Sequence, residues 1–326
     1  MLSERKAAIL QAVVEGYIST SEPVGSSQIV TSTGLDVSSA TVRSEMASLE
    51  DEGYLQQPHT SAGRVPSDKG YRYFVDTLME PYTLGRSQQH KVASFFEAAQ
   101  GELEVMLKQT SGFLSRLTDY AAVVVGPGAE ASPIRGVQVV RLSTDQALLV
   151  VVRANAVISK RMAPIDPDVT DTDLESCAKR LVAVYVDGHD DPVSGVGEDG
   201  LFQQLSAVVA EPEERPVFVG GTASVAGIFD AVEQVQDVLE VLEKQYLVVT
   251  LVKDVLDRGL EVAIGSETGV APLNECSLVV SPVDIDGVSS ASVALLGPTR
   301  MQYPQAMATV ALVSQQLSDH LRDGDS

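Results

Sequence analysis

Residues 37–55 constrain the fold most, because they combine a helical pattern, one outward arginine and a glycine that precedes a strand. Val42, Met46 and Leu49 recur at i, i+4 and i+7 and predict the buried stripe of a short helix. The outward positions are mostly small: Ser39, Ala40, Thr41, Arg43, Ser44 and Ala47. Small side chains let a helix enter the DNA major groove, and the guanidinium fork of arginine pairs with guanine. The segment therefore indicates a recognition helix, with an ordinary amphipathic helix as the alternative.

The flanking segments favour the first interpretation. Upstream, apolar residues at helical spacing over 2–19 predict one helix, and the stretch 22–27 breaks it and caps a second helix that ends at Gly34. Downstream, residues 54–57 are expected to form a strand, and residues 58–66 are rich in proline, glycine and small polar residues, as a loop is. This order of helices, strand and loop is typical of a winged helix-turn-helix.

The loop is expected to act as a wing beside the recognition helix. Its polar groups suit phosphates or the minor groove, and the candidate residues are His59, Thr60, Ser61 and Arg64. Ser67 then caps a further helix in which Tyr71 and Phe74 face inward. Lys69 and Arg72 are expected to stay outside and to complete the DNA-binding set.

Two separated stretches resemble the HrcA family, the bacterial heat-inducible transcription repressors. The first covers residues 38–76 and is sharpest over 58–76, which read PHTSAGRVPSDKGYRYFVD. The second covers residues 295–303, which read LLGPTRMQY. The resemblance implies an α+β fold: an N-terminal winged helix-turn-helix, then a GAF-like α/β domain interrupted by an inserted dimerisation domain.

The same resemblance implies a function. Such a protein would repress chaperone genes, bind an inverted-repeat DNA operator, the CIRCE element, as a homodimer, and be kept active by the chaperonin GroEL. A two-fold dimer suits an inverted repeat because each winged helix meets an equivalent half-site. Two alternatives stay open: a regulator that senses a small molecule in its GAF-like domain, and an adaptor whose winged helix binds protein.

The pattern of elements divides the chain. Strands are expected at 122–125, 137–142, 147–153 and 156–162, then a mostly helical block, then strands at 260–264, 278–283 and 293–296. Residues 148–152 are apolar on both faces and predict the centre of a sheet. An apolar stripe over 103–117 fits either a core face or a dimer seam. The expected domains are 1–79 for DNA binding, 80–86 as linker, 87–165 and 241–326 as the GAF-like domain, and 166–240 as the insertion.

Charge is the strongest objection to DNA binding, because the 326 residues carry a net charge of −22 at pH 7. Up to Val75 there are six cations and nine carboxylates, a net charge of −3, and the remainder carries 17 cations and 36 carboxylates, a net charge of −19. Salt screens charges beyond about 10 Å, so a local cationic patch can act apart from a distant acidic body. Binding is expected to be modest and salt-sensitive.

Other features argue against membranes, metals and catalysis. No apolar run approaches the roughly 20 residues that span a bilayer, and the N-terminal residues show no signal-peptide core, so a cytoplasmic protein is expected. Cys177 and Cys276 have no cysteine or histidine neighbours and are expected to be buried thiols rather than metal ligands. The glycines of 195–200 follow no strand, and two carboxylates between them would repel a pyrophosphate. Neither a cofactor nor an enzymatic activity is expected.

Overall fold

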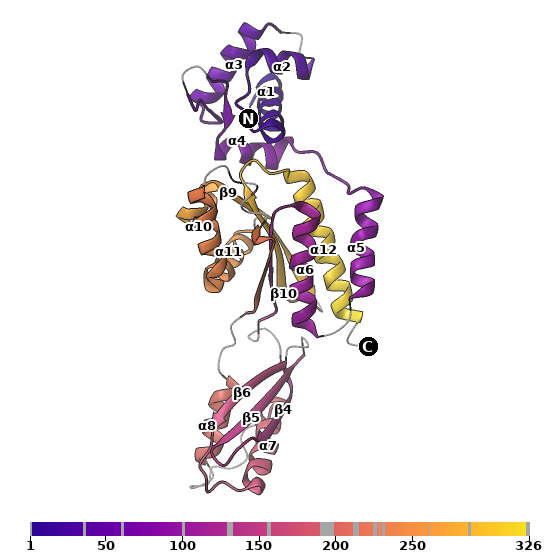
Figure 1. Ribbon diagram of the computed structural model, residues 1–326, viewed down its shortest axis with the longest axis vertical. Coiled ribbons are helices and arrows are strands. Elements are labelled where there is room, and N and C mark those ends of the chain that lie inside the picture. The colour runs from indigo at the N-terminus through magenta and orange to yellow at the C-terminus, as the bar shows by residue number, and fades with distance from the viewer. Residues whose placement is uncertain are drawn as a thin grey trace.

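The protein is an α+β chain, as expected from the sequence, and its elements form three units that follow one another in space (Figure 1). We call them the head, the body and the distal unit. The computed structural model describes residues 2–34, 37–59, 62–99, 102–128, 133–154, 158–189, 199–210, 215–223, 227, 229, 232–259, 261–285 and 288–323.

The head contains four α-helices and a two-stranded sheet among its described residues. Its elements are α1 (Glu4–Thr20), α2 (Ser26–Thr33), α3 (Ser39–Asp51), β1 (Leu55–Gln56), β2 (Val65–Pro66), α4 (Asp68–Tyr73) and a π-helical turn, η1 (Phe74–Leu78). Ser38 and Ser67 cap α3 and α4 by accepting hydrogen bonds from the backbone N–H groups of Thr41 and Gly70. The helices predicted over this region, and the end of α2 at Gly34, are confirmed.

The core of the head explains why these helices pack together. Val42, Met46 and Leu49 of α3 are buried, as their spacing predicted, and they belong to one apolar cluster with Ile9 and Leu10 of α1. Gly34 adopts a φ of +63° at the C-terminal end of α2, a left-handed conformation that glycine adopts without steric cost.

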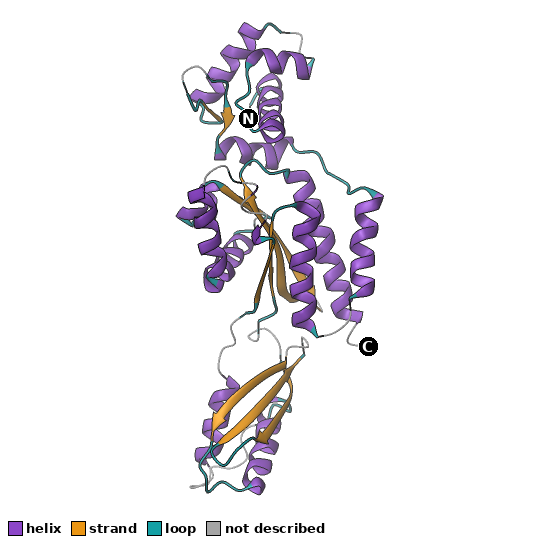
Figure 2. Ribbon diagram, in the orientation of Figure 1, coloured by secondary structure: helices purple, strands orange, loops and turns teal. Residues whose placement is uncertain are grey.

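The body is built on an antiparallel sheet with the strand order β7-β3-β10-β9-β8. The strands are β3 (Ala121–Val125), β7 (Val217–Gly220), β8 (Val262–Ile264), β9 (Cys276–Ile285) and β10 (Val288–Pro298). Helices α5 (Arg86–Ala98), α6 (Leu103–Thr118) and α12 (Tyr303–Asp323) lie on one side of the sheet, and α10 (Val232–Glu243) and α11 (Gln245–Asp257) lie on the other (Figure 2). Short 3₁₀ helices, η3 (Gly265–Thr268) and η4 (Ala271–Leu273), follow β8.

The packing of the body decides one prediction that the sequence left open, and it adds a strand that the sequence did not predict. The apolar stripe of α6 is a core face, because Leu107 and Leu114 are fully buried and Phe113 packs against the same cluster. Strand β7 was not predicted, because only four residues pair there and glycines end the run. Its neighbour β3 is buried along its whole length, as a strand covered on both faces must be.

The distal unit forms a separate sheet with the order β4-β5-β6. Its elements are β4 (Ile134–Arg141), β5 (Gln146–Arg153), β6 (Ile158–Pro164), α7 (Asp171–Tyr185) and α8 (Asp199–Ala210). Strand β5 is central, as predicted for residues 148–152. The expected grouping of these strands with the body sheet is wrong, because Leu149 and Val151 pack with Leu181 and Leu205 of α7 and α8 in their own core. The boundary expected at residue 166 therefore falls inside the distal unit.

Three further features singled out in the sequence are the possible membrane spans, the two cysteines and the glycine motif. Among the described residues, no helix combines the length and apolar character needed to cross a bilayer. Cys177 and Cys276 are both buried, and burial raises the pKa of the Cys276 thiol to about 12. Residues 195–198 of the glycine motif lie outside the described residues.

Candidate nucleic-acid interface

Helix α3 lies at the end of the head that is far from the body, whereas α4 faces the body (Figure 1). The burial of its apolar stripe leaves the opposite side of α3 to solvent. The exposed residues on that side are the predicted ones, Ser39, Ala40, Arg43, Ser44 and Ala47, and Thr41 is half-buried near the helix start. The outward face of α3 is thus formed by small side chains around one arginine.

The acidic residues of α3 and its C-cap are paired with cations from other segments. Glu45 lies 3.6 Å from Arg5, and Glu50 lies 2.7 Å from Arg64. Glu52, at the helix end, accepts a hydrogen bond from Lys6, which holds the pKa of Glu52 below its usual value. Three carboxylates that would repel a phosphate backbone are therefore offset by neighbouring cations. Asp51 is the exposed acidic residue that remains.

Arg43 differs from these cations. Its side chain is exposed, and the described residues provide it with no hydrogen bond or ion pair. A guanidinium group carries its donors in a rigid fork, so an available one on an exposed helix face suits a base edge or a phosphate.

Arg64 lies against α3 instead of extending from the loop. Its Nε donates to Glu50 Oε2 at 2.8 Å, and its backbone pairs with Val24 through two N–H···O bonds of 2.9 Å. A side chain at the preceding Gly63 would bring a Cβ atom within 2.3 Å of the Val24 carbonyl oxygen, so this position requires glycine. His59 is exposed at the loop, and Thr60 and Ser61 lie outside the described residues.

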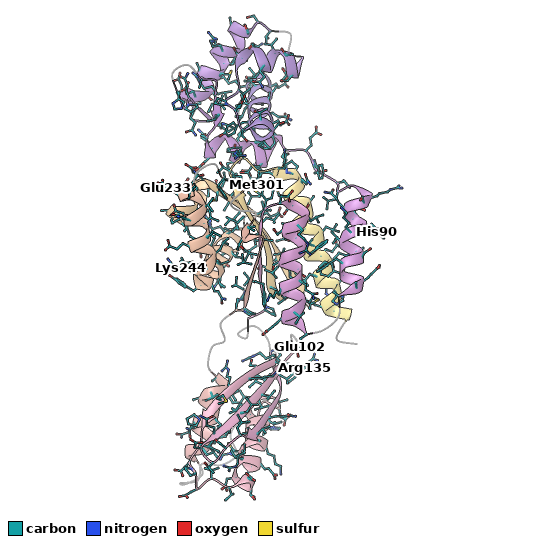
Figure 3. All side chains as sticks on the ribbon, viewed as in Figure 1. His90, Glu102, Arg135, Glu233, Lys244 and Met301 are labelled. Atoms are coloured by element: carbon teal, nitrogen blue, oxygen red, sulfur yellow. The ribbon has the colours of Figure 1, made fainter. Side chains whose placement is uncertain are left out.

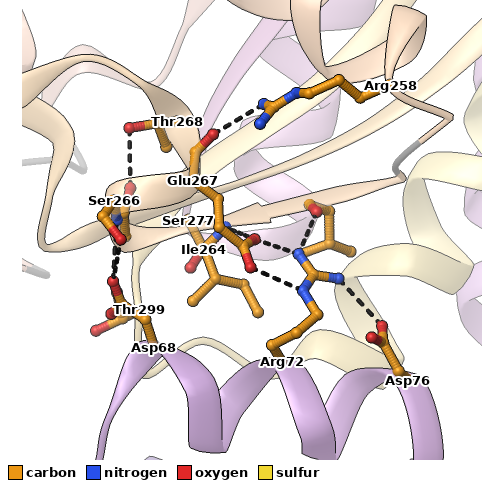
Figure 4. Close-up of polar contacts among 12 residues, drawn as sticks. Asp68, Arg72, Asp76, Arg258, Ile264, Ser266, Glu267, Thr268, Ser277 and Thr299 are labelled. Carbon is orange, nitrogen blue, oxygen red and sulfur yellow. Dashed lines mark hydrogen bonds and ion pairs between the residues drawn. The ribbon is translucent and has the colours of Figure 1, made fainter.

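Lys69 and Arg72 have different surroundings from those expected. Lys69 is exposed, but its Nζ donates to the Glu52 carbonyl oxygen at 2.8 Å and lies 4.3 Å from the centre of the Tyr54 ring. Arg72 does not stay outside, because the body covers its side of α4. Its side chain is only 21% exposed and contacts Glu267, which is 195 residues away in the chain (Figure 4).

The contact between head and body was not visible in the sequence, although the residues that form it were. Tyr71 and Tyr303 belong to the two stretches that resemble one family, and their rings lie 5.9 Å apart between head and body. Met301, labelled in Figure 3 at the end of the body nearest the head, is fully buried there. The two stretches that are far apart in the sequence therefore meet in one interface.

Comparisons with known proteins show the family to which the chain is related. Residues 104–307 match the family model described as HrcA protein C terminal domain. The heat-inducible transcription repressor HrcA of Carboxydothermus hydrogenoformans is 35% identical over 98% of each chain, and that of Pelotomaculum thermopropionicum is 34% identical over 98% of this chain and 97% of the relative.

One solved structure shares the whole fold. The crystal structure of a hypothetical protein aligns with a TM-score of 0.65 and 21% identity over 99% of each chain. This likeness concerns the fold alone, whereas the family model and the relatives match in sequence over most of the chain. The chain belongs to the HrcA family of heat-inducible transcription repressors.

Proposed function

We propose that this protein represses heat-shock genes by binding an inverted-repeat DNA operator as a homodimer. In this proposal α2 and α3 form a helix-turn-helix, α3 is the recognition helix, and β1, β2 and their loop form the wing. The names of the relatives support repression, and the exposed arginine of α3 supports DNA contact. The central observation is that Arg43 is exposed and available on a helix whose neighbouring carboxylates Glu45, Glu50 and Glu52 are ion-paired.

The DNA contacts follow from this placement. The proposed groove-facing residues are Ser39, Ala40, Thr41, Arg43, Ser44 and Ala47, and His59, Thr60 and Ser61 are proposed wing contacts. Arg64 and Lys69 lie beside α3 and are proposed to support it: Arg64 offsets Glu50, and Lys69 binds the end of the helix. Arg72 is occupied between head and body, and we do not assign it to DNA.

A second copy of the chain is proposed to bind the outer face of the distal sheet. Helices α7 and α8 pack against one face of that sheet. On the other face, Val140, Ile158 and Met162 are 47%, 58% and 58% exposed, and Val140 and Met162 both neighbour Leu148 in register. Exposed apolar patches of this kind often mark protein interfaces. A homodimer would supply two equivalent heads for an inverted repeat.

The test is DNA binding by the Arg43→Ala variant, measured by fluorescence anisotropy with a labelled inverted-repeat duplex. We expect a loss of about 1 to 3 kcal/mol in binding free energy and weaker discrimination between operator and scrambled DNA. Lys91→Ala, which removes an exposed cation from α5 in the body, is the matched control and should bind normally. Unchanged specific binding by Arg43→Ala would refute α3 as the recognition helix.

The family resemblance supports two finer parts of the proposal. The operator would be the CIRCE element upstream of chaperone genes, and the chaperonin GroEL would keep the repressor active. Strands with many β-branched residues, such as β5, aggregate when exposed, so a chain with a separate inserted unit can need assistance to fold. Adding GroEL to the same titration, before and after mild heating, should then increase the fraction of protein that binds DNA.

A ligand-responsive regulator is the second candidate, and one observation favours it. A cavity of about 560 Å³ lies between head and body and is lined by Tyr17, Tyr71, Asn274 and Arg300, among others. The Tyr71 hydroxyl is buried and finds no hydrogen-bond partner in the described part of the chain. Native mass spectrometry of the purified protein tests this candidate, since a bound small molecule would add a fixed mass. Full operator binding without GroEL would also favour it.

A further inference from the structure

We propose that a set of polar contacts between head and body determines which half-site spacing the protein accepts in an inverted repeat. We call this set the clasp. It consists of Asp68 and Arg72 of α4 in the head, and of Val262, Ser266 and Glu267 in the body (Figure 4). The inference rests on the proposed function, because it concerns a dimer that binds two half-sites.

Arg72 is held from three directions. Its Nε donates to Glu267 Oε1 at 3.0 Å, and one terminal nitrogen donates both to the second Glu267 oxygen and to the Val262 carbonyl oxygen, the latter at 2.7 Å. The other terminal nitrogen donates to Asp76 at 3.1 Å. A bidentate arginine–carboxylate pair has a preferred plane as well as a preferred distance. The contact therefore restricts rotation of α4 against the body.

The acceptor side of the clasp is itself fixed. Glu267 Oε2 accepts from the backbone N–H of Ile264 at 2.9 Å, and the Glu267 carbonyl oxygen accepts from Arg258 at 2.8 Å. Both contacts tie Glu267 to its own domain. The carboxylate is thus a rigid part of the body, and Arg72 cannot carry it along when the head moves.

A second polar contact lies one helical turn away from Arg72. Here the head supplies the acceptor and the body supplies the donors. Asp68 in the head accepts from the backbone N–H and from the hydroxyl of Ser266, at 3.0 and 2.8 Å. The neighbouring Gly265 has a φ of +52°, and a Cβ atom there would lie 2.5 Å from the Asp68 carboxylate. Two contacts at separate points of α4 fix its direction, whereas one would leave it free to pivot.

The apolar contact beside the clasp cannot supply this direction alone. Tyr71, Met301 and Tyr303 are buried in one cluster that continues from the head into the body. Apolar burial stabilises the contact but is non-directional, so a joint of this kind tolerates small rotations. The directional part of the interface is the hydrogen-bonded clasp.

The orientation of the head determines where α3 lies in the proposed dimer, because the proposed dimer contact is in the distal unit. The distal unit and the head lie at opposite ends of the molecule (Figure 1), and residues 79–85, which have neither helix nor strand, join head to body. A rotation between head and body therefore displaces α3 relative to the two-fold axis. One added base pair rotates a half-site by about 35° and moves it about 3.4 Å along the duplex, so a fixed head should reject an altered spacer.

The experiment measures the affinity of the full chain for inverted repeats whose spacer is changed one base pair at a time, and for an isolated half-site. Wild-type protein should lose about tenfold or more in affinity when the preferred spacer is changed by one base pair. Glu267→Gln and Arg72→Gln should lose less than about threefold, with unchanged half-site affinity. Ser266→Ala, which removes one donor to Asp68, should be intermediate.

Asp171→Asn is the matched control, because it breaks the exposed Arg141–Asp171 ion pair of the distal unit and should keep the wild-type spacer profile. The inference is wrong if the clasp variants keep that profile, or if they lose affinity equally for every duplex, the half-site included. If wild-type protein does not prefer an inverted repeat to a half-site, the proposed function fails instead. Thermal unfolding of each variant checks that the chain is folded.

Discussion

In the proposed function, the ion pairs around α3 matter more for DNA binding than for stability. Exposed ion pairs typically contribute about 0 to 1 kcal/mol each. The Arg5–Glu45 and Lys6–Glu52 pairs therefore add little to folding, whereas the Arg64–Glu50 pair is part-buried. All three pairs lower the negative charge next to the exposed face of α3. In the proposed function, this pairing would let a recognition helix carry several carboxylates.

Alkaline pH should destabilise the protein through buried acids. Burial raises the pKa of Tyr71 and Tyr303, and that of Cys276 to about 12. The folded state therefore keeps these protons while the unfolded chain releases them above about pH 9. Stability from these groups is complete below about pH 9 and decreases toward about pH 12, by up to about 1.4 kcal/mol per pH unit for each group.

Urea unfolding followed by circular dichroism at about pH 7.5, 9, 10 and 11 measures this effect, because the unfolded tyrosines titrate near pH 10. Tyr303→Phe should flatten the pH dependence, although it also removes the hydrogen bonds of the hydroxyl with Ser277 and Thr299. Tyr246→Phe is the control, because Tyr246 is 68% exposed. A free energy of unfolding that does not change between about pH 8 and 10 would contradict the assignment.

Residue patterns predicted the buried side of α3 but not the partners of its cations. The positions of Val42, Met46 and Leu49 follow from helix geometry, which is local. The partner of Arg72 is Glu267, which is 195 residues away in the chain, so the contact depends on the tertiary fold. An outward position on an isolated helix is therefore not necessarily exposed, and this is why Arg72 was placed wrongly.

At the scale of elements, most strand positions were predictable, β2 and β7 excepted, and sheet membership was not. Residues 148–152 are apolar on both faces, which correctly predicts a central strand. This apolar pattern cannot indicate whether the strand pairs within the body sheet or in a sheet of its own, because both environments bury the same side chains. The separate cluster around Leu149 and Leu181 decides this question, and it depends on tertiary contacts.

The exposed face of the distal sheet carries a prediction about assembly. Met162→Asp should weaken the proposed homodimer by about tenfold or more, because a carboxylate would be buried in an apolar interface. Sedimentation velocity at micromolar concentrations compares the variant with wild type. Val232→Asp is the control, since Val232 is 73% exposed on α10 in the body. A dimer that resists Met162→Asp, or wild-type protein that is monomeric, would refute this interface.

At the scale of the molecule, charge is divided along the chain. The residues up to Val75 carry −3 over 75 residues and the remainder −19 over 251, so the head carries about half as much negative charge per residue as the rest. Ionic strength near 0.1 M screens charges over about 10 Å, which would let α3 approach DNA in the proposed function while the body repels non-specific DNA. The expected result is modest affinity with strong dependence on salt.

The two resembling stretches also acquire a physical meaning at this scale. Residues 58–76 and 295–303 are separated by more than half of the chain, yet Tyr71 of the first contacts Tyr303 of the second. Their sequence pattern identified the family, but only the folded chain places them together. The head–body interface was therefore beyond sequence reasoning, whereas its residues were not.

The most direct test of DNA reading by a dimer is a titration of the full chain against three duplexes: an inverted repeat, a single half-site and a scrambled sequence. The titration is repeated at about 50 and 200 mM salt. We predict tightest binding to the inverted repeat, with two protomers per duplex, and a marked loss of affinity at the higher salt. Equal affinity for all three duplexes, or no binding at either salt concentration, would contradict the account and favour a protein-binding adaptor.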